Sequence, residues 1–167
     1  YGMYERDTEI SAYIGEAQSV YQLESEKLAY DYMLQEYLAS GNTQMVQELE
    51  AAPVSMETGT PAGYLAVRDL AMHSLGIGTT RDMKSIVTGI FLSSLTFREY
   101  TLMDKVNLWR GKARNGVSVI WDTSLYTDLR QQVIEFDLPI YFLEGIYDYT
   151  CNYSLAMDYF EKIEAPV

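Results

Sequence analysis

The sequence predicts an α/β fragment that is predominantly α-helical, in which two short parallel strands flank a layer of helices. Residues 139–148, PIYFLEGIYD, form a short apolar run that begins with a proline and is broken by a glycine. Such a run is typical of a strand that is buried on both faces of a parallel sheet. Residues 11–15, SAYIG, form a second short run that ends on a glycine. The long interval between the two runs has the periodicity of amphipathic helices, so we expect two strands and a helical insertion.

The first helix of this interval is expected from about Leu23 to Gly41, with its apolar positions on one face. The polar face of that helix is predicted to carry Glu24, Glu26, Lys27, Asp31, Gln35 and Glu36. Capping residues and helix breakers predict further helices at about 43–51, 61–75, 81–91, 97–115, 118–132 and 153–164. The expected N-caps are Asn42 or Thr43, Thr60, Thr80 and Thr96.

The helical interval is far longer than a connection between two strands requires. Parallel strands need a crossover, which is usually a single helix. We therefore expect the surplus helices to form a separate cap or lid over the carboxyl edge of the sheet. The predicted organisation is a core segment over residues 1–20, a helical cap over 21–136 and a second core segment over 137–167.

Composition and charge limit the possible partners. The 167 residues are 48% hydrophobic and carry 24 acidic against 12 basic side chains, a formal net charge of −12. This charge repels phosphate, so neither nucleic acid nor an anionic membrane surface is an expected partner. The sequence has no apolar run long enough to span a bilayer and no start typical of a secretory signal, so a cytoplasmic protein is expected.

Cys151 is the one cysteine and His73 the one histidine, so we expect no internal disulfide and no zinc site. No other metal and no cofactor is predicted. We interpret Cys151 as a packed loop cysteine, with a nucleophilic role as the alternative. The methionines and tyrosines of the helical layer either form its core or line an adaptable pocket for apolar ligands.

Residues 139–150, PIYFLEGIYDYT, with the helical stretch that follows them, resemble the late-strand region of α/β-hydrolases. The resemblance is closest to bacterial members that are distantly related to prolyl aminopeptidases. It implies that the two strands belong to an α/β-hydrolase sheet and that Asp148 is the acid of a Ser-Asp-His triad. A purely local role of the Gly-x-x-Asp turn is the alternative. Residues 102–111 and Trp121 resemble later parts of the family's cap.

Residues 16–20, EAQSV, resemble a family segment near the mouth of the active site. The resemblance implies substrate-binding roles for Gln18 and Glu16. For Gln18 the alternative is an ordinary loop amide. Ala17 stands where the family usually has glycine, so the backbone of this loop is expected to depart from the family's.

Two members of the implied triad are missing from the sequence. It contains no Gly-x-Ser-x-Gly motif, and His73 precedes Asp148, whereas the α/β-hydrolase order is serine, acid, histidine. A triad acid without its partners cannot perform the reaction. We therefore expect an internal segment of a larger enzyme, inactive alone, that starts just after the nucleophile and has its base beyond Val167. The parent is expected to hydrolyse a small-molecule ester, an amide or a short peptide through an acyl-enzyme.

A non-catalytic helical protein-interaction module is the alternative function. A sheet of two strands exposes unpaired edges and apolar faces, and such surfaces favour pairing between chains. We therefore expect a homo-oligomer that forms through these surfaces.

Overall fold

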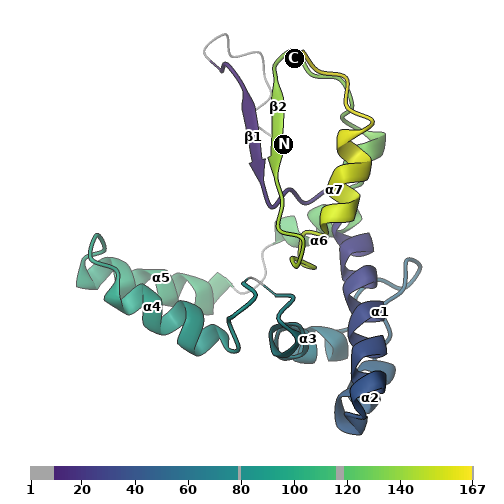
Figure 1. Cartoon of the computed structure of the whole chain (residues 1–167). Helices are drawn as coiled ribbons and strands as arrows, with labels where there is room; N and C mark the ends of the chain where they lie inside the picture. The colour runs from purple at the N-terminus through teal and green to yellow at the C-terminus, as the bar shows by residue number, and fades with distance from the viewer. Residues whose placement is uncertain (1–9, 79, 116–118, 167) are drawn as a thin grey trace.

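The computed structural model describes residues 10–78, 80–115 and 119–166. In these ranges it is predominantly helical, with seven α-helices and two short strands (Figure 1). The predicted combination of a helical chain with two short strands is confirmed.

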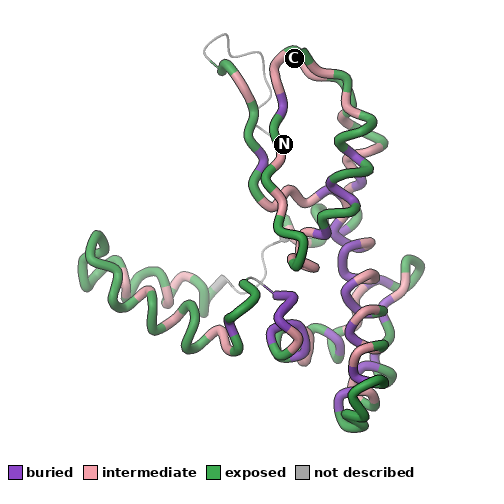
Figure 2. The backbone as a smooth tube through the Cα atoms, in the orientation of Figure 1, coloured by how far each residue is buried: buried purple, intermediate pink, exposed green. Residues whose placement is uncertain are grey.

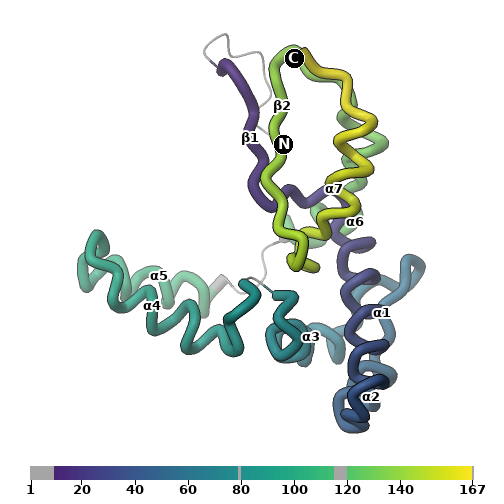
Figure 3. The backbone as a smooth tube through the Cα atoms, viewed as in Figure 1, coloured from purple at the N-terminus to yellow at the C-terminus, as the bar shows by residue number. Residues whose placement is uncertain are grey.

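The strands β1 (Tyr13–Glu16) and β2 (Ile140–Leu143) pair in parallel, as the sequence predicts. Tyr13 is in register with Ile140, and Glu16 with Leu143. Figure 3 shows the two strands side by side although they come from opposite ends of the chain. The ladder continues past the strands, because the amide of Ala17 donates to the carbonyl of Leu143 at 3.0 Å.

Helices α1 (Gln22–Ser40), α2 (Thr43–Glu50) and α3 (Ala62–Leu75) pack around one core, to which α6 (Val119–Tyr126) contributes Leu125. The largest buried side chains of this core include Leu23, Tyr30, Met33, Tyr37, Leu49, Val54, Tyr64, Met72 and Ile77. The predicted break between α1 and α2 is confirmed. Gly41 adopts the left-handed conformation that ends α1, and the Asn42 side chain accepts the amide of Met45 at 3.2 Å.

Helix α7 (Tyr153–Phe160) covers one face of the sheet. The ring of Phe142 on β2 lies 5.9 Å from that of Tyr159 and 5.7 Å from that of Phe160. Tyr159 belongs to a second, smaller core cluster with Val20, Leu155 and Ala156. The α7 side of the sheet is therefore packed by the helix that follows β2 in the chain.

A helical hairpin lies apart from this body in Figure 1. It consists of the π-helical turn η1 (Val87–Phe91), α4 (Leu92–Thr96) and α5 (Leu102–Asn115). The two arms are joined where Phe91 meets Trp109 edge to face, and where the Trp109 indole donates to Ser94 at 2.8 Å. Figure 2 shows that the hairpin is formed by exposed and half-buried residues. Leu102 at its tip is 80% exposed.

Two predicted N-caps in this region, Thr80 and Thr96, are wrong. Thr80 does not cap a helix, because residues 81–85 form turns and irregular structure before the helical hairpin begins. Thr96 ends α4 instead of starting the next helix. The N-cap of α5 is Thr101, whose hydroxyl accepts the amide of Asp104 at 3.2 Å while its own amide donates to the Asp104 carboxylate.

The predicted helix over 118–132 is also broken, because α6 ends at Tyr126 before the short 3₁₀ turn η2 (Leu129–Gln131).

None of the helices in the described ranges combines the length and the apolar character that a bilayer crossing requires.

The sheet face opposite α7 is uncovered by the described residues. Ile14 is in register with Tyr141, and parallel partners in register project to the same face. Ile14, Tyr141 and Leu143 are 64%, 54% and 60% exposed, respectively. Each strand also has only one neighbour within the described ranges. This arrangement offers an apolar face and two open strand edges to another molecule or another segment.

We predict that the chain self-associates through this face. The double change Tyr141→Glu and Leu143→Glu should shift the protein toward monomer in sedimentation velocity, because it places charge in the apolar contact. The matched change Leu70→Glu, which alters an equally exposed apolar residue on α3, should leave the association unchanged. A monomer at high concentration before any substitution would contradict the prediction.

Candidate functional site

Asp148 lies in the turn that follows β2, at the carboxyl end of the sheet. Its carboxylate Oδ1 accepts the amides of Thr150 at 2.8 Å and of Cys151 at 3.1 Å. Its own amide donates to the carbonyl of Gly145 at 3.0 Å. Asp148 therefore stabilises the turn, and within the described part of the chain Oδ2 has no hydrogen-bond partner.

Glu144 follows the last residue of β2, and Gln18 lies in the loop that follows β1. The backbone amide of Gln18 donates to Glu144 Oε1 at 2.9 Å. This bond joins the loop after β1 to the start of the acid turn. Glu144 Oε2 is buried and has no partner among the described residues. Burial raises the pKa of Glu144, and the negative charge of Asp148 raises it further. The hydrogen bond from the Gln18 backbone amide acts in the opposite direction and lowers this pKa. The sequence gives no signal for a role of Glu144, which is one acidic residue within an apolar run.

The Gln18 side chain is bound within its own loop. Its carbonyl oxygen accepts the Tyr13 hydroxyl at 2.5 Å, and its amide group donates to the carbonyl of Ser19 at 2.8 Å. Glu16 is exposed at the carboxyl end of β1. Neither side chain lines the cavity described below, and their substrate-binding roles remain predictions.

Ala17 has φ 49°, the one left-handed backbone conformation at a residue other than glycine in the described ranges. This conformation is costly for an L-amino acid with a Cβ atom. In this conformation the backbone amide of Ala17 donates to the carbonyl of Leu143, and the backbone amide of Gln18 donates to the carboxylate of Glu144. Ala17 therefore holds a backbone conformation that glycine adopts without strain.

Glu26 contradicts its predicted place on the polar face of α1, because its side chain is completely buried. Arg68 on α3 binds it with two hydrogen bonds, from Nε at 2.6 Å and Nη2 at 2.7 Å. The Tyr64 hydroxyl and the Gln22 amide also donate to Glu26, at 2.8 and 3.0 Å. Gln22 donates in addition to the carbonyl of Thr150 at 2.9 Å, so these bonds link α1 and α3 to the acid turn.

The charges in this network shift the properties of its members. Burial raises the pKa of Tyr64, and the neighbouring Glu26 carboxylate raises it further. Burial alone would lower the pKa of Arg68, but its hydrogen bonds and charge interaction with Glu26 outweigh that effect and raise it. Both groups therefore keep their protons over the accessible pH range.

Cys151 is half-buried beside the acid turn. Burial raises the pKa of its thiol to about 11, and the charges of Asp148, Glu144 and Glu26 contribute to the shift. A reactive cysteine needs a thiolate, which these surroundings disfavour. This environment supports the interpretation of Cys151 as a packed loop cysteine.

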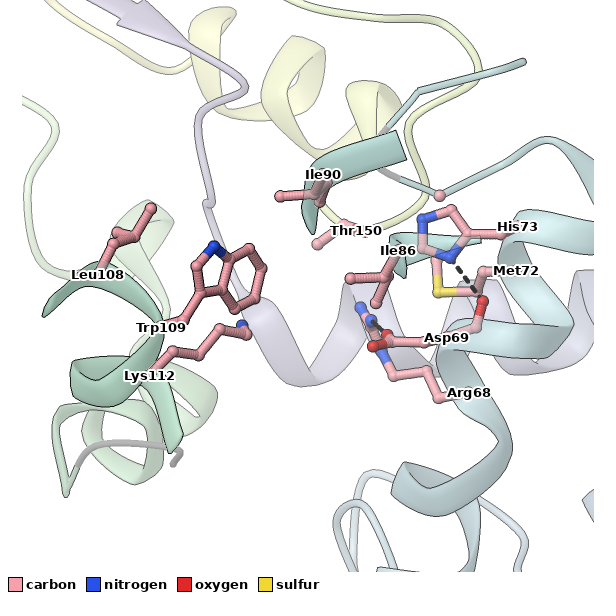
Figure 4. Close-up of a pocket in the computed structure, with 11 residues that line it drawn as sticks. Arg68, Asp69, Met72, His73, Ile86, Ile90, Leu108, Trp109, Lys112 and Thr150 are labelled. Atoms are coloured by element: carbon pink, nitrogen blue, oxygen red, sulfur yellow. Dashed lines mark hydrogen bonds and ion pairs between the residues drawn. The ribbon is translucent and has the colours of Figure 1, made fainter. Parts of the chain in front are cut away.

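A cavity of about 300 Å³ lies between α3, the η1 turn and α5 (Figure 4). Its lining residues are Arg68, Asp69, Met72, His73, Gly78, Ile86, Ile90, Leu108, Trp109, Lys112 and Thr150. Thr150 brings the acid turn to the cavity wall, because its amide is bonded to Asp148. Met33, Met45 and Met72 of the helical layer belong to the core, and among these three Met72 also lines the cavity.

His73 is buried in the cavity wall, where Nδ1 lies 2.6 Å from the carbonyl of Asp69 one helical turn earlier. Gly78 passes close to the imidazole, and a Cβ atom at this position would lie 2.4 Å from the ring. The sequence predicts no site role for His73, which precedes Asp148 in the chain. Its position in the cavity wall follows from the approach of the loop after α3.

The described residues contain no group of three or more His, Cys, Asp or Glu side chains that could hold a metal ion. The chain matches no protein-family model, no curated protein and no solved structure. The resemblance to α/β-hydrolases therefore stays a prediction.

We predict that Glu26→Gln lowers the free energy of unfolding by about 3–5 kcal/mol, because it leaves the Arg68 guanidinium buried without its partner charge. Urea unfolding measures the loss. The control is Asp31→Asn, which removes the half-exposed ion pair with Lys27 on the same helix and should cost about 0.5 kcal/mol or less. Equal losses in the two variants would contradict the role of Glu26.

We predict that Ala17→Gly raises the free energy of unfolding by about 0.5–1 kcal/mol, because glycine adopts the left-handed conformation without strain. The matched change Ala66→Gly, at an exposed position within α3, should lower it by about 1 kcal/mol. A destabilising effect of Ala17→Gly would show that this backbone conformation is not strained.

Proposed function

We propose that this chain is the cap-containing segment of a serine α/β-hydrolase that acts on an ester or an amide, including short peptides. The observation that carries the proposal is the position of Asp148. Its carboxylate lies in the turn at the carboxyl end of β2, and the same turn forms part of the cavity wall. In open α/β sheets, ligands bind outside the carboxyl ends of the strands.

The hydrogen bonds of Asp148 suit a triad acid. Two backbone amides hold Oδ1, which fixes the orientation of the carboxylate. Oδ2 is then free to accept a hydrogen bond from an imidazole N–H. In a Ser-Asp-His triad such an acid holds the histidine in the required tautomer and stabilises its charge, while the histidine takes the proton of the serine.

The uncovered face of the sheet also supports the proposal. A strand pair that is packed on one face alone, with apolar residues on the other, fits a sheet that has further strands and a second covering layer. We propose that the nucleophilic serine and the histidine belong to that remaining part of the enzyme, outside the 167 residues. The helices α1–α3 and the hairpin would then cover the substrate.

The hairpin favours the alternative function. From η1 through α5 it has no fully buried residue among those described, and it exposes Leu102, Met103 and Val106. An apolar helical surface of this kind suits a protein-interaction module. The reading frame around the chain separates the two functions. The hydrolase requires a Gly-x-Ser-x-Gly motif upstream and a histidine downstream, and the module requires neither.

We predict that Asp148→Asn in the longer enzyme lowers kcat by about 10⁴-fold on short acyl esters or aminoacyl amides. Asparagine can still accept the two turn amides, so the fold should be retained while the histidine loses its anionic partner. Asp158→Asn, at an exposed position on α7, is the matched control and should keep full activity. Turnover within a few-fold of the original enzyme in Asp148→Asn would reject the proposed triad acid.

A further inference from the structure

The cavity between α3 and the hairpin combines an apolar wall with several charged groups. Met72, Ile86, Ile90, Leu108 and Trp109 supply the apolar part. Its volume of about 300 Å³ lies at the lower end of the range typical of small-molecule sites, about 300–1,000 Å³. Ile90 and Leu108 are 39% and 46% exposed, so a ligand with an apolar body would cover surface that is now open to water.

The charged groups of the cavity are not equally available. Arg68 is fully engaged, with Nε and Nη2 on Glu26 and Nη1 on Asp69 at 2.9 Å. The Asp69 carboxylate is therefore already paired with a cation. Lys112 differs, because no described residue forms an ion pair or hydrogen bond with its ammonium group. Lys112 is thus the available charge of the cavity, and it is positive in a chain whose formal net charge is −12.

The side chains of α5 are arranged to hold two different parts of one ligand. Trp109 and Lys112 are three residues apart, which places them on the same side of the helix. In Figure 4 both extend from α5 toward the cavity, opposite the side chains of α3. An aromatic or aliphatic body can lie against the indole and Ile90 while an anionic group reaches the ammonium.

We propose that this cavity binds a small organic anion that consists of a carboxylate on an apolar body. Lys112 binds the carboxylate, and Trp109 with Ile90 contacts the body. The cavity shares Thr150 with the acid turn, and the Thr150 amide is 2.8 Å from Asp148 Oδ1. On the basis of the proposed function, the substrate is then an ester or amide whose acyl or leaving part carries a carboxylate.

The binding test uses the 167-residue chain and the fluorescence of Trp109. The change Trp121→Phe removes the other tryptophan, so that Trp109 alone reports. Three probes share one phenyl body and differ in charge: 3-phenylpropanoate, 3-phenylpropanamide and 3-phenylpropylamine. We expect the acid to bind about fivefold more tightly than the amide, as for one partly exposed ion pair, and the amine to bind most weakly. Calorimetry with the unsubstituted chain repeats the comparison without the Trp121 change.

Variants of α5 assign the preference to one side chain. Lys112→Gln should bind the acid and the amide equally, and Lys112→Arg should keep the preference for the acid. Arg110→Gln removes the same charge from the same helix but lies outside the cavity lining, so it should also keep the preference. Circular dichroism confirms that each variant is folded.

Several outcomes would overturn the inference: equal binding of acid and amide, tightest binding of the amine, an unchanged preference in Lys112→Gln, or no binding of any probe. The result is separable from the proposed hydrolase. Binding is measured on the 167-residue chain without turnover, and turnover is measured separately on the longer enzyme. Loss of turnover in Asp148→Asn together with failed binding would therefore retain the hydrolase and reject this ligand class.

Discussion

The buried carboxylate of Glu26 is the constraint on which the rest of this structure depends. A charge without water must be paired and hydrogen-bonded, and Glu26 obtains its partners from two helices. Arg68 and Tyr64 fix α3 against α1, and Gln22 carries the connection to the carbonyl of Thr150. The orientation of the acid turn relative to the helices is therefore set by hydrogen bonds as well as by apolar packing.

The sheet and the cavity meet at this turn. The two parallel strands hold its beginning, through the left-handed backbone at Ala17 and the bond from Gln18 to Glu144. The Glu26 network holds its end. Asp148 lies between these two anchors, with one carboxylate oxygen fixed by backbone amides. Such preorganisation suits the orienting acid of the proposed function.

The sequence predicts those features that depend on local chemistry. The two strands, the glycine that ends α1 and the asparagine that caps α2 follow from short patterns of residue type. The prediction that Thr80 and Thr96 cap helices is wrong, because a threonine can suit several neighbouring positions in a sequence equally well. The reciprocal bonds of Thr101 with Asp104 show that Thr101, and not Thr96, is the N-cap of α5.

The sequence by itself determined a mostly helical chain with two strands and an aspartate after the second, because periodicity and strand breakers act over a few residues. Only the tertiary structure decided that Glu26 is buried, that His73 and Thr150 share a cavity wall, and that Lys112 reaches the same space. These outcomes depend on groups distant in the sequence. A glutamate on a helix is suited to water until an arginine and a tyrosine from another helix make burial favourable.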